Sequence, residues 1–221
     1  MKSLVVDFAR DPNHAYKFNV ASMAWNNHFF FSGINTDPEA VSQPSSDLLR
    51  ELNKNFISLD TLRTEFLATA DAMFGPGYVW LVQLNDVSGK PMRIMSTYLA
   101  GTPISGAHYR KQPVDLNVHN PDSIQNLNTA TAEPINTVGA FGSNAAKQKV
   151  KPKLPLGGTD IVPLLCVNTW QHVWLHDYGI TGKRAYLEKW WDKINWEKVR
   201  QYTNISSQAN ARYNESQFQK F

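Results

Sequence analysis

The segment at residues 167–199, VNTWQHVWLHDYGITGKRAYLEKWWDKINWEKV, decides the fold of this chain. It holds five of the seven tryptophans in a sequence of 221 residues. The apolar run IVPLLCV, at residues 161–167, lies between a Gly-Gly pair and Asn168, which predicts a buried strand. From Lys183 onward the apolar residues recur mostly every three or four positions, which predicts a helix. The core therefore contains a strand that leads into helices rich in tryptophan.

The preceding sequence predicts helices first and a hairpin afterwards. Residues 2–30 have a helical apolar pattern that Asp11-Pro12 interrupts. Two further amphipathic helices are predicted, one ending at Phe56 and one at residues 58–74. The Gly-Pro-Gly at 75–77 then breaks the chain, and the strands at residues 78–84 and 92–98 form a hairpin.

Three stretches resemble the signatures of iron and manganese superoxide dismutases. NTWQHVWL at residues 168–175, followed by WDKINW at 191–196, resembles the family's D-x-W-E-H-A-Y-Y and W-x-x-x-N-W. FNVASMAWNNHFFF at residues 18–31 resembles F-N-x-A-x-Q-x-W-N-H-x-F-x-W without a gap. The order FGPGYVWLV, hairpin, STYLAGTP resembles the first part of the family's C-terminal domain.

This resemblance implies an α+β fold in which N-terminal helices precede a three-stranded antiparallel sheet packed with helices. We expect the family's first helix to be missing. The expected division is a helical remnant at residues 1–34, an α/β domain at 35–205 with an insertion at 106–158, and a polar tail at 206–221.

The same alignment implies that the metal site is lost. The family binds its metal through three histidines and one aspartate. The aspartate position holds Asn168, one histidine position holds Asn27, and another belongs to the family's first helix, which is expected to be missing, so that only His172 is retained. The two positions where the family places a solvent-orienting glutamine hold Met23 and Ala100. We therefore expect no metal, no other cofactor and no catalysis, with the two amides preserving the packing.

Two interpretations of His172 remain open. It is either a metal ligand or a core histidine that Asn168 or Asn27 satisfies, and the loss of its partner ligands favours the core histidine. His28 could replace the lost histidine only through a register shift. On a helix its side chain points about 100° away from the direction of position 27. An enzyme with a ligand set rearranged around His28 and His172 is therefore the less favoured alternative.

Composition restricts the environment of the chain. No apolar run approaches the roughly 18 residues that span a membrane, and the first ten residues are not expected to act as a signal peptide, because their apolar part is short and Asp7 interrupts it. The single Cys166 indicates a reducing compartment and, inside an apolar strand, a buried inert thiol. Residues 106–158 carry six basic side chains against three acidic, and 183–221 carry eight against four. Such basic segments suit a polyanion, but at this charge density an ordinary solvated surface is the favoured interpretation.

Two groups of residues are candidates for contacts. Dismutases dimerise through the E-H-x-Y element, whose counterpart here supplies Gln171, Trp174 and Leu175, amide and apolar groups that an equally altered partner would complement. The most basic part of the insertion supplies candidates for RNA or protein contacts: Lys147, Lys149, Lys151 and Lys153.

Lost ligands combined with basic additions resemble the dismutase-like proteins of the fungal mitochondrial small ribosomal subunit. This resemblance implies a non-catalytic structural protein that is bound to the ribosome in the mitochondrial matrix. The partners it implies are a second dismutase-like ribosomal protein in a heterodimer, other small-subunit proteins, and rRNA as a further candidate. A free mitochondrial binding protein outside the ribosome is a third interpretation.

Overall fold

The computed structural model describes residues 1–9, 11–37, 42–85, 89–105, 107 and 160–203. The N-terminal elements are α1 (Lys2–Ala9), a 3-10 helix η1 (Pro12–His14), α2 (Ala15–Ser32), α3 (Ser46–Phe56) and α4 (Leu59–Asp71). The strands are β1 (Gly77–Leu84), β2 (Met92–Tyr98) and β3 (Ile161–Asn168). The chain continues through α6 (Gln171–Tyr178), α7 (Lys183–Asp192) and α8 (Trp196–Tyr202). The α+β arrangement expected from the sequence is confirmed.

The strands form one antiparallel sheet in the order β2-β1-β3, with β1 in the centre. The expected hairpin is present, because Gly77 pairs with Tyr98 and Gln83 with Met92. The C-terminal strand returns on the other side of β1, where Tyr78 lies opposite Asn168. A strand that is paired on both sides and covered on both faces needs apolar residues throughout, and β1 is buried along nearly its whole length.

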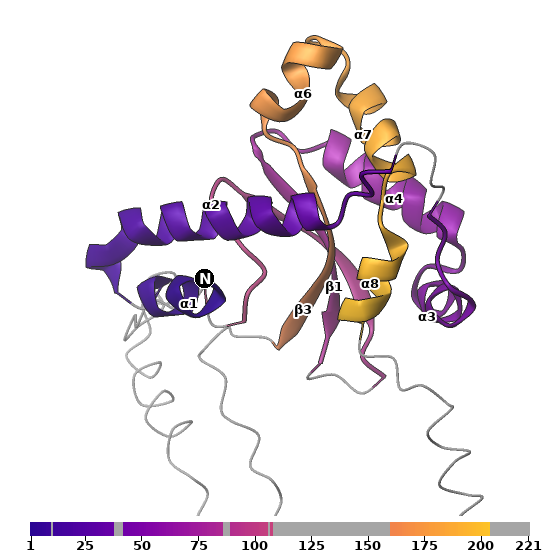
Figure 1. Ribbon diagram of the computed structural model, residues 1–221, viewed down its shortest axis with the longest axis horizontal. Coiled ribbons are helices and arrows are strands. Elements are labelled where there is room, and N and C mark those ends of the chain that lie inside the picture. Colours follow the sequence, from indigo (N-terminus) through magenta and orange to yellow (C-terminus); the bar gives the residue numbers. More distant parts are fainter. Residues whose placement is uncertain (10, 38–41, 86–88, 106, 108–159, 204–221) are drawn as a thin grey trace, which may run out of the picture.

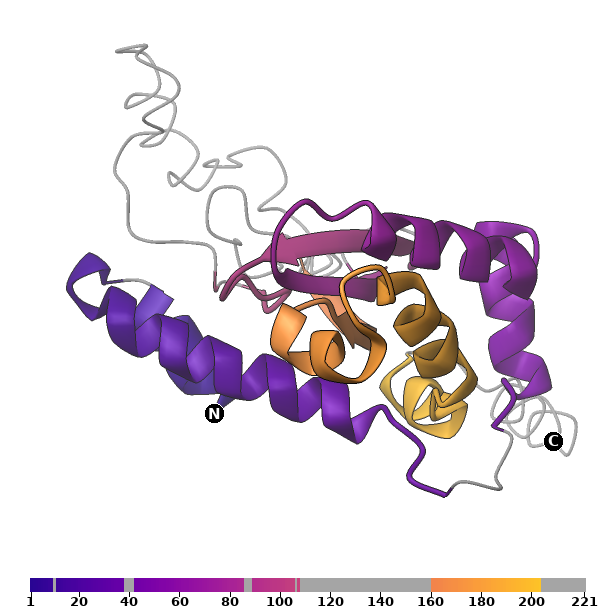
Figure 2. The same cartoon turned by 90° about the horizontal axis from the view of Figure 1, so that it is seen from above.

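Helices cover the two faces of this sheet, with α2 on one side and α4 on the other (Figures 1 and 2). The ring of Trp25 in α2 stacks on Trp80 in β1, with 5.9 Å between centroids. On the other side, Phe66 of α4 stacks on Trp190 of α7 at 5.5 Å. Four tryptophans of the C-terminal segment are therefore core residues, namely Trp174, Trp190, Trp191 and Trp196, and Trp170 is partly buried against them.

Helix α4 ends earlier than its sequence indicates. The Ser58 side chain caps its start by accepting a hydrogen bond from the backbone N–H of Thr61 at 3.1 Å. The apolar pattern predicts a helix to residue 74, but the helix ends at Asp71, and Phe74 is fully exposed. The residues just before the Gly-Pro-Gly at 75–77 take part in the turn. Phe74, the last apolar residue of the pattern, therefore lies outside the helix.

A second, smaller core lies at the far end of α2. Val5 and Ala9 of α1 pack there against Phe18, and Ile104 and Ala107 complete the cluster. Figure 1 shows α1 beneath the part of α2 that extends beyond the sheet. Within the described ranges no helix is long and apolar enough to cross a membrane.

Candidate functional site

The two asparagines at the family's ligand positions lie together between α2 and the sheet. Asn168 ends β3 directly opposite Tyr78 of β1, and directly opposed residues project from the same face of a sheet. Helix α2 crosses this face and places Asn27 above the pair. Sequence alignment alone therefore identified two residues that the fold brings into contact.

Hydrogen bonds join these groups into one cluster. The amide Nδ2 of Asn168 donates to Oδ1 of Asn27 at 3.0 Å, and the Tyr78 hydroxyl donates to the same oxygen at 3.1 Å. The backbone N–H of Trp170 donates to Oδ1 of Asn168 at 2.9 Å, and the Tyr186 hydroxyl donates to the Asn168 carbonyl at 2.8 Å. Both side-chain oxygens that could face a cation are thus already acceptors.

Burial keeps this cluster electrically neutral. Asn168 is 1% exposed, and burial raises the pKa values of the Tyr78 and Tyr186 hydroxyls well above their usual range. Both phenols therefore remain protonated and act as donors at physiological pH. Amide groups suit such a site because they carry no charge that burial would penalise.

The residues in this cluster do not fit the iron or manganese that the family binds. Such ions select imidazole and carboxylate donors, whereas this cluster offers two amides and two protonated phenols. No group of three or more His, Cys, Asp or Glu side chains that could hold a metal occurs in the part of the chain that the structure describes. The arrangement can hold α2 on the sheet, but it cannot supply the anionic ligand of a redox metal.

The expectation that His172 is a core histidine is wrong. His172 lies in the first turn of α6, is exposed, and places its ring 5.6 Å from that of Trp170. The physical reason is that Asn27 and Asn168 satisfy each other, so neither amide needs the imidazole. His28, the other histidine of the rearranged alternative, is also exposed, on α2.

The two positions that lack the family's glutamine have other functions. Met23 lies under the Tyr78 hydroxyl, with 3.8 Å between oxygen and sulfur. The backbone of Ala100 accepts a hydrogen bond from the Ser22 hydroxyl, and the next carbonyl, that of Gly101, accepts one from Asn26 Nδ2 at 2.9 Å. Both positions now connect α2 to neighbouring structure.

Outside this cluster, α6 and the turn after it expose both apolar and polar side chains, and His172, His176 and Asp177 are among the polar ones. In α6, Gln171 and Leu175 are exposed, and Ile180 just after it is 86% exposed. Lys183, which begins α7 three residues after Ile180, holds the end of α4, because its ammonium donates to the carbonyls of Asp71 and Met73 at 2.9 and 3.3 Å. Phe74 therefore adjoins the same region. We call Phe74, Gln171, Leu175 and Ile180 the α6 surface.

The interface candidates differ in where they lie. Gln171 and Leu175 belong to the α6 surface, but Trp174 is 7% exposed and its indole N–H points at the Thr169 carbonyl, 3.4 Å away. Trp174 would thus support an interface from beneath. Cys166 is buried, and burial raises the pKa of its thiol, as expected for an inert core residue. The candidates Lys147, Lys149, Lys151 and Lys153 lie outside the described residues.

Sequence reasoning missed four residues of these sites. Tyr78 and Tyr186 were treated only as apolar positions of a strand and a helix, because nothing in the pattern reveals where a phenol hydroxyl points. Phe74 and Ile180 had a usable signal, since each is a large apolar residue beside a glycine turn. Such a residue cannot always reach the core, and several exposed ones that form one patch indicate a contact surface.

Comparison with known proteins gives relatives of two kinds, superoxide dismutases and proteins of the small ribosomal subunit. The model of the C-terminal domain of iron/manganese superoxide dismutases matches residues 44–118 and 142–202, more than half of the chain. The small ribosomal subunit protein mS42 of Schizosaccharomyces pombe is 32% identical, over 92% of this chain and 75% of its own length. Protein mS43 of the same organism is 24% identical over 89% of the chain, and the iron superoxide dismutase of Escherichia coli is 26% identical over 82%. This chain spans 64% of each of these last two proteins. The chain therefore belongs to the iron/manganese superoxide dismutase family.

Proposed function

We propose that this protein is a non-catalytic structural component of the mitochondrial small ribosomal subunit. One observation carries the proposal: the Asn27–Asn168 hydrogen bond occupies the place where the family's enzymes have two of their metal ligands, a histidine and an aspartate. A sequence that had merely lost a ligand would leave an unpaired buried group, which costs about 1–3 kcal/mol. Here the substitutions form a complete cluster, as expected of a fold retained as a scaffold.

The relatives support the same conclusion. Protein mS42, which is 32% identical over 92% of this chain, is named as a protein of the small ribosomal subunit, and so is mS43. The bacterial dismutase matches over a smaller share of the chain. A dismutase with ligands rearranged around His28 and His172 gains no support from two exposed imidazoles on different helices.

We further propose that the α6 surface binds a second dismutase-like ribosomal protein. Phe74 and Ile180 are large apolar side chains that are almost entirely exposed, and Leu175 is 40% exposed between them in sequence. Exposed apolar groups gathered in one region are characteristic of protein interfaces. A heterodimer would bury them, and the neutral Gln171 would accept a partner that lacks a complementary charge.

The experiment is sedimentation of the full chain, expressed in fungal mitochondria, through a sucrose gradient at high salt. We expect the wild-type protein to migrate with the small ribosomal subunit and without bound iron or manganese. Migration as a small free dimer with one equivalent of either metal and dismutase activity would overturn the proposal.

A substitution separates the interface from ribosome association in general. Leu175→Asp places a charge on the α6 surface and should reduce the share of protein in the ribosomal fraction at least tenfold. Ile57→Asp is the control, because Ile57 is 85% exposed but lies at the junction of α3 and α4. Equal migration of both variants with the subunit would contradict a role for the α6 surface.

A further inference from the structure

Strand β2 has a free edge. It is one of the two outer strands of the sheet, and its partner β1 lies on one side only. The other outer strand, β3, packs against α2 and α8, and β2 itself contacts α3 and α4. Natural sheets usually protect such an edge, because its unpaired N–H and C=O groups can pair with another chain.

The hydrogen bonds at the two ends of the hairpin identify which backbone groups of β2 point outward. Leu84 donates to the carbonyl of Pro91, and Leu99 donates to the carbonyl of Pro76, so the odd-numbered residues between 91 and 99 face β1. The even-numbered residues face away. In agreement, the backbone N–H of Met92 points outward and donates to Oδ1 of Asn55 at 2.9 Å.

Two residues in the middle of this edge keep both backbone groups open. Ile94 and Ser96 have outward N–H and C=O groups, and none of these groups bonds to another described residue. At the ends, Asn55 takes the N–H of Met92, and the carbonyl of Tyr98 accepts from Gly101 at 2.9 Å. The open groups thus form a short ladder that is closed at both ends.

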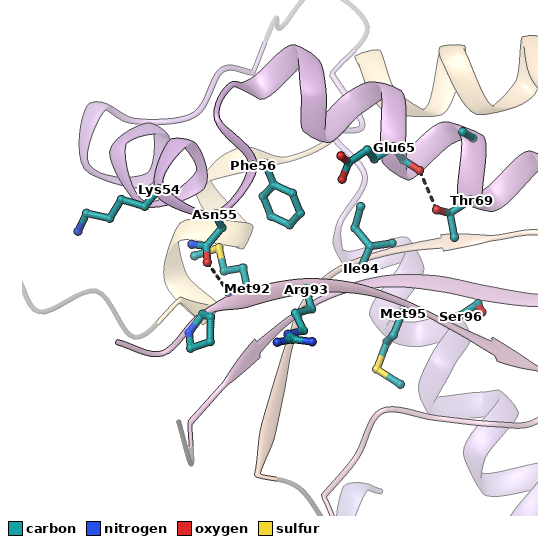
Figure 3. A pocket seen from close by; sticks show the side chains of 12 residues that line it. Lys54, Asn55, Phe56, Glu65, Thr69, Met92, Arg93, Ile94, Met95 and Ser96 are labelled. Carbon is teal, nitrogen blue, oxygen red and sulfur yellow. Dashed lines mark hydrogen bonds between the residues drawn. The ribbon is translucent and has the colours of Figure 1, made fainter. Parts of the chain in front are cut away.

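A groove runs along this edge. A cavity of about 930 Å³ lies between the end of α3, helix α4 and residues 91–96 of β2. Figure 3 shows Ile94 and Phe56 projecting to the helix side of β2, and Arg93 and Met95 projecting to the other side. An added strand would therefore meet Phe56 and Ile94, with the polar Glu65 and Thr69 beyond them, on one face and the cation of Arg93 on the other.

The sequence of β2 lacks the usual protection of an edge strand. MRIMSTY contains no proline, no lysine and no glycine, and its single charge is Arg93. Pro91 precedes the strand, where it cannot block the central residues. An edge of seven residues with this composition is expected to pair with a complementary strand.

We propose that this edge binds an extended segment of another protein, which adds a fourth strand beside β2. Alternate residues of an extended segment face opposite sides. The segment should carry apolar residues toward Phe56 and Ile94 and a carboxylate toward Arg93. Backbone bonds to Ile94 and Ser96 provide the attachment, as in strand-addition complexes generally. This inference does not depend on the ribosomal assignment.

The test uses the full chain and a displayed library of random peptides of about ten residues. Ser96→Pro removes one outward N–H and leaves the bonds to β1 intact, because proline is tolerated where an edge N–H faces solvent. Ser96→Ala retains that N–H and is the matched control. We expect selected peptides to alternate apolar and acidic residues, to bind wild type and S96A equally, and to bind S96P at least tenfold more weakly.

A second variant guards against a folding defect in S96P. Arg93→Glu preserves the backbone and reverses the charge, so it should reject the acidic peptides and accept lysine-containing versions of them. Binding that is indifferent to both S96P and R93E would overturn the proposal, as would the absence of any selected peptide. Concentration-dependent self-association that S96P abolishes would assign the edge to a second copy of this chain instead, and would also overturn it.

Discussion

Asn168 differs from the aspartate of its family by one group of atoms, an amide NH₂ in place of an oxygen. That group is the donor to Asn27, so the change converts a site for a cation into a closed contact between two side chains. The amide oxygen still accepts from the backbone of Trp170. The substitution therefore keeps the local turn after β3 and changes only what the side chain faces.

Restoring the aspartate should not restore the metal site. In Asn168→Asp the carboxylate would be buried and would face the Asn27 oxygen as a second acceptor, and we expect a loss of about 2–4 kcal/mol in the free energy of unfolding. The loss should shrink as the pH falls, because burial raises the pKa of a carboxyl and its protonated form can donate again. Urea denaturation at pH 5 and pH 8 measures both effects.

The exposed Asn19 of α2, the helix that carries Asn27, provides the control for this experiment. Asn19→Asp should change the free energy of unfolding by less than about 0.5 kcal/mol. A stable N168D variant that binds iron or manganese would contradict our account of the cluster.

The same residues show how far sequence alone could reach. Alignment located Asn27 and Asn168 because an aromatic framework on both sides fixed their register, and the structure brings them together. It placed His172 in the core, because the sequence cannot show that the two amides satisfy each other. Hydrogen-bond partners depend on side-chain direction, which residue spacing does not determine.

Strand β1 positions the asparagine cluster, because it carries Tyr78 and pairs with the end of β3. Its first residue, Gly77, is tightly surrounded by neighbouring atoms. Gly77 begins the strand, and its carbonyl accepts from both the backbone and the hydroxyl of Thr169, at 2.9 and 3.0 Å. A Cβ added there would lie 2.1 Å from the carbonyl oxygen of Thr97 and 2.8 Å from the end of the Met73 side chain. The start of β1 therefore has no space for a side chain.

Gly77→Ala should lower the free energy of unfolding by about 3 kcal/mol or more, because the backbone of β2 would have to move. Gly33→Ala is the matched control. Its Cβ would meet its nearest neighbour at 3.5 Å, an ordinary contact, so its effect should stay below about 1 kcal/mol. Thermal unfolding followed by tryptophan fluorescence compares the two, and equal midpoints would contradict the steric account.

Sequence reasoning was more successful for the elements than for their ends. Strict apolar runs between glycine turns gave the strands β1 and β3, since a central or covered strand has few alternatives. The end of α4 was missed because the apolar pattern continues into the turn through Phe74. The apolar pattern indicates which residues are hydrophobic, but it does not indicate that one of them, Phe74, lies on the surface.

Across the whole molecule, one neutral core joins three parts of the sequence that are far apart. It contains Tyr78 from β1, Cys166 from β3 and Tyr186 from α7, and burial raises the pKa of each group. Each group therefore holds its proton more tightly in the folded than in the unfolded chain. Their contribution to stability is complete below the unfolded pKa values, near 8.5 for a thiol and about 10 for a phenol, and decreases above them.

The folded state should consequently lose stability steadily as the pH rises above about 9. Tyr78→Phe removes one of the responsible groups, so between pH 8 and pH 11 its free energy of unfolding should fall less than that of the wild type. At pH 8 the same variant should be about 1–2 kcal/mol less stable, since Oδ1 of Asn27 loses a donor.

Tyr16→Phe is the control, because this side chain of α2 is 79% exposed, and its stability should follow the wild-type curve. Urea denaturation across this range measures all three proteins, and parallel curves for wild type and Y78F would mean that protonation of the buried phenol does not stabilise the fold.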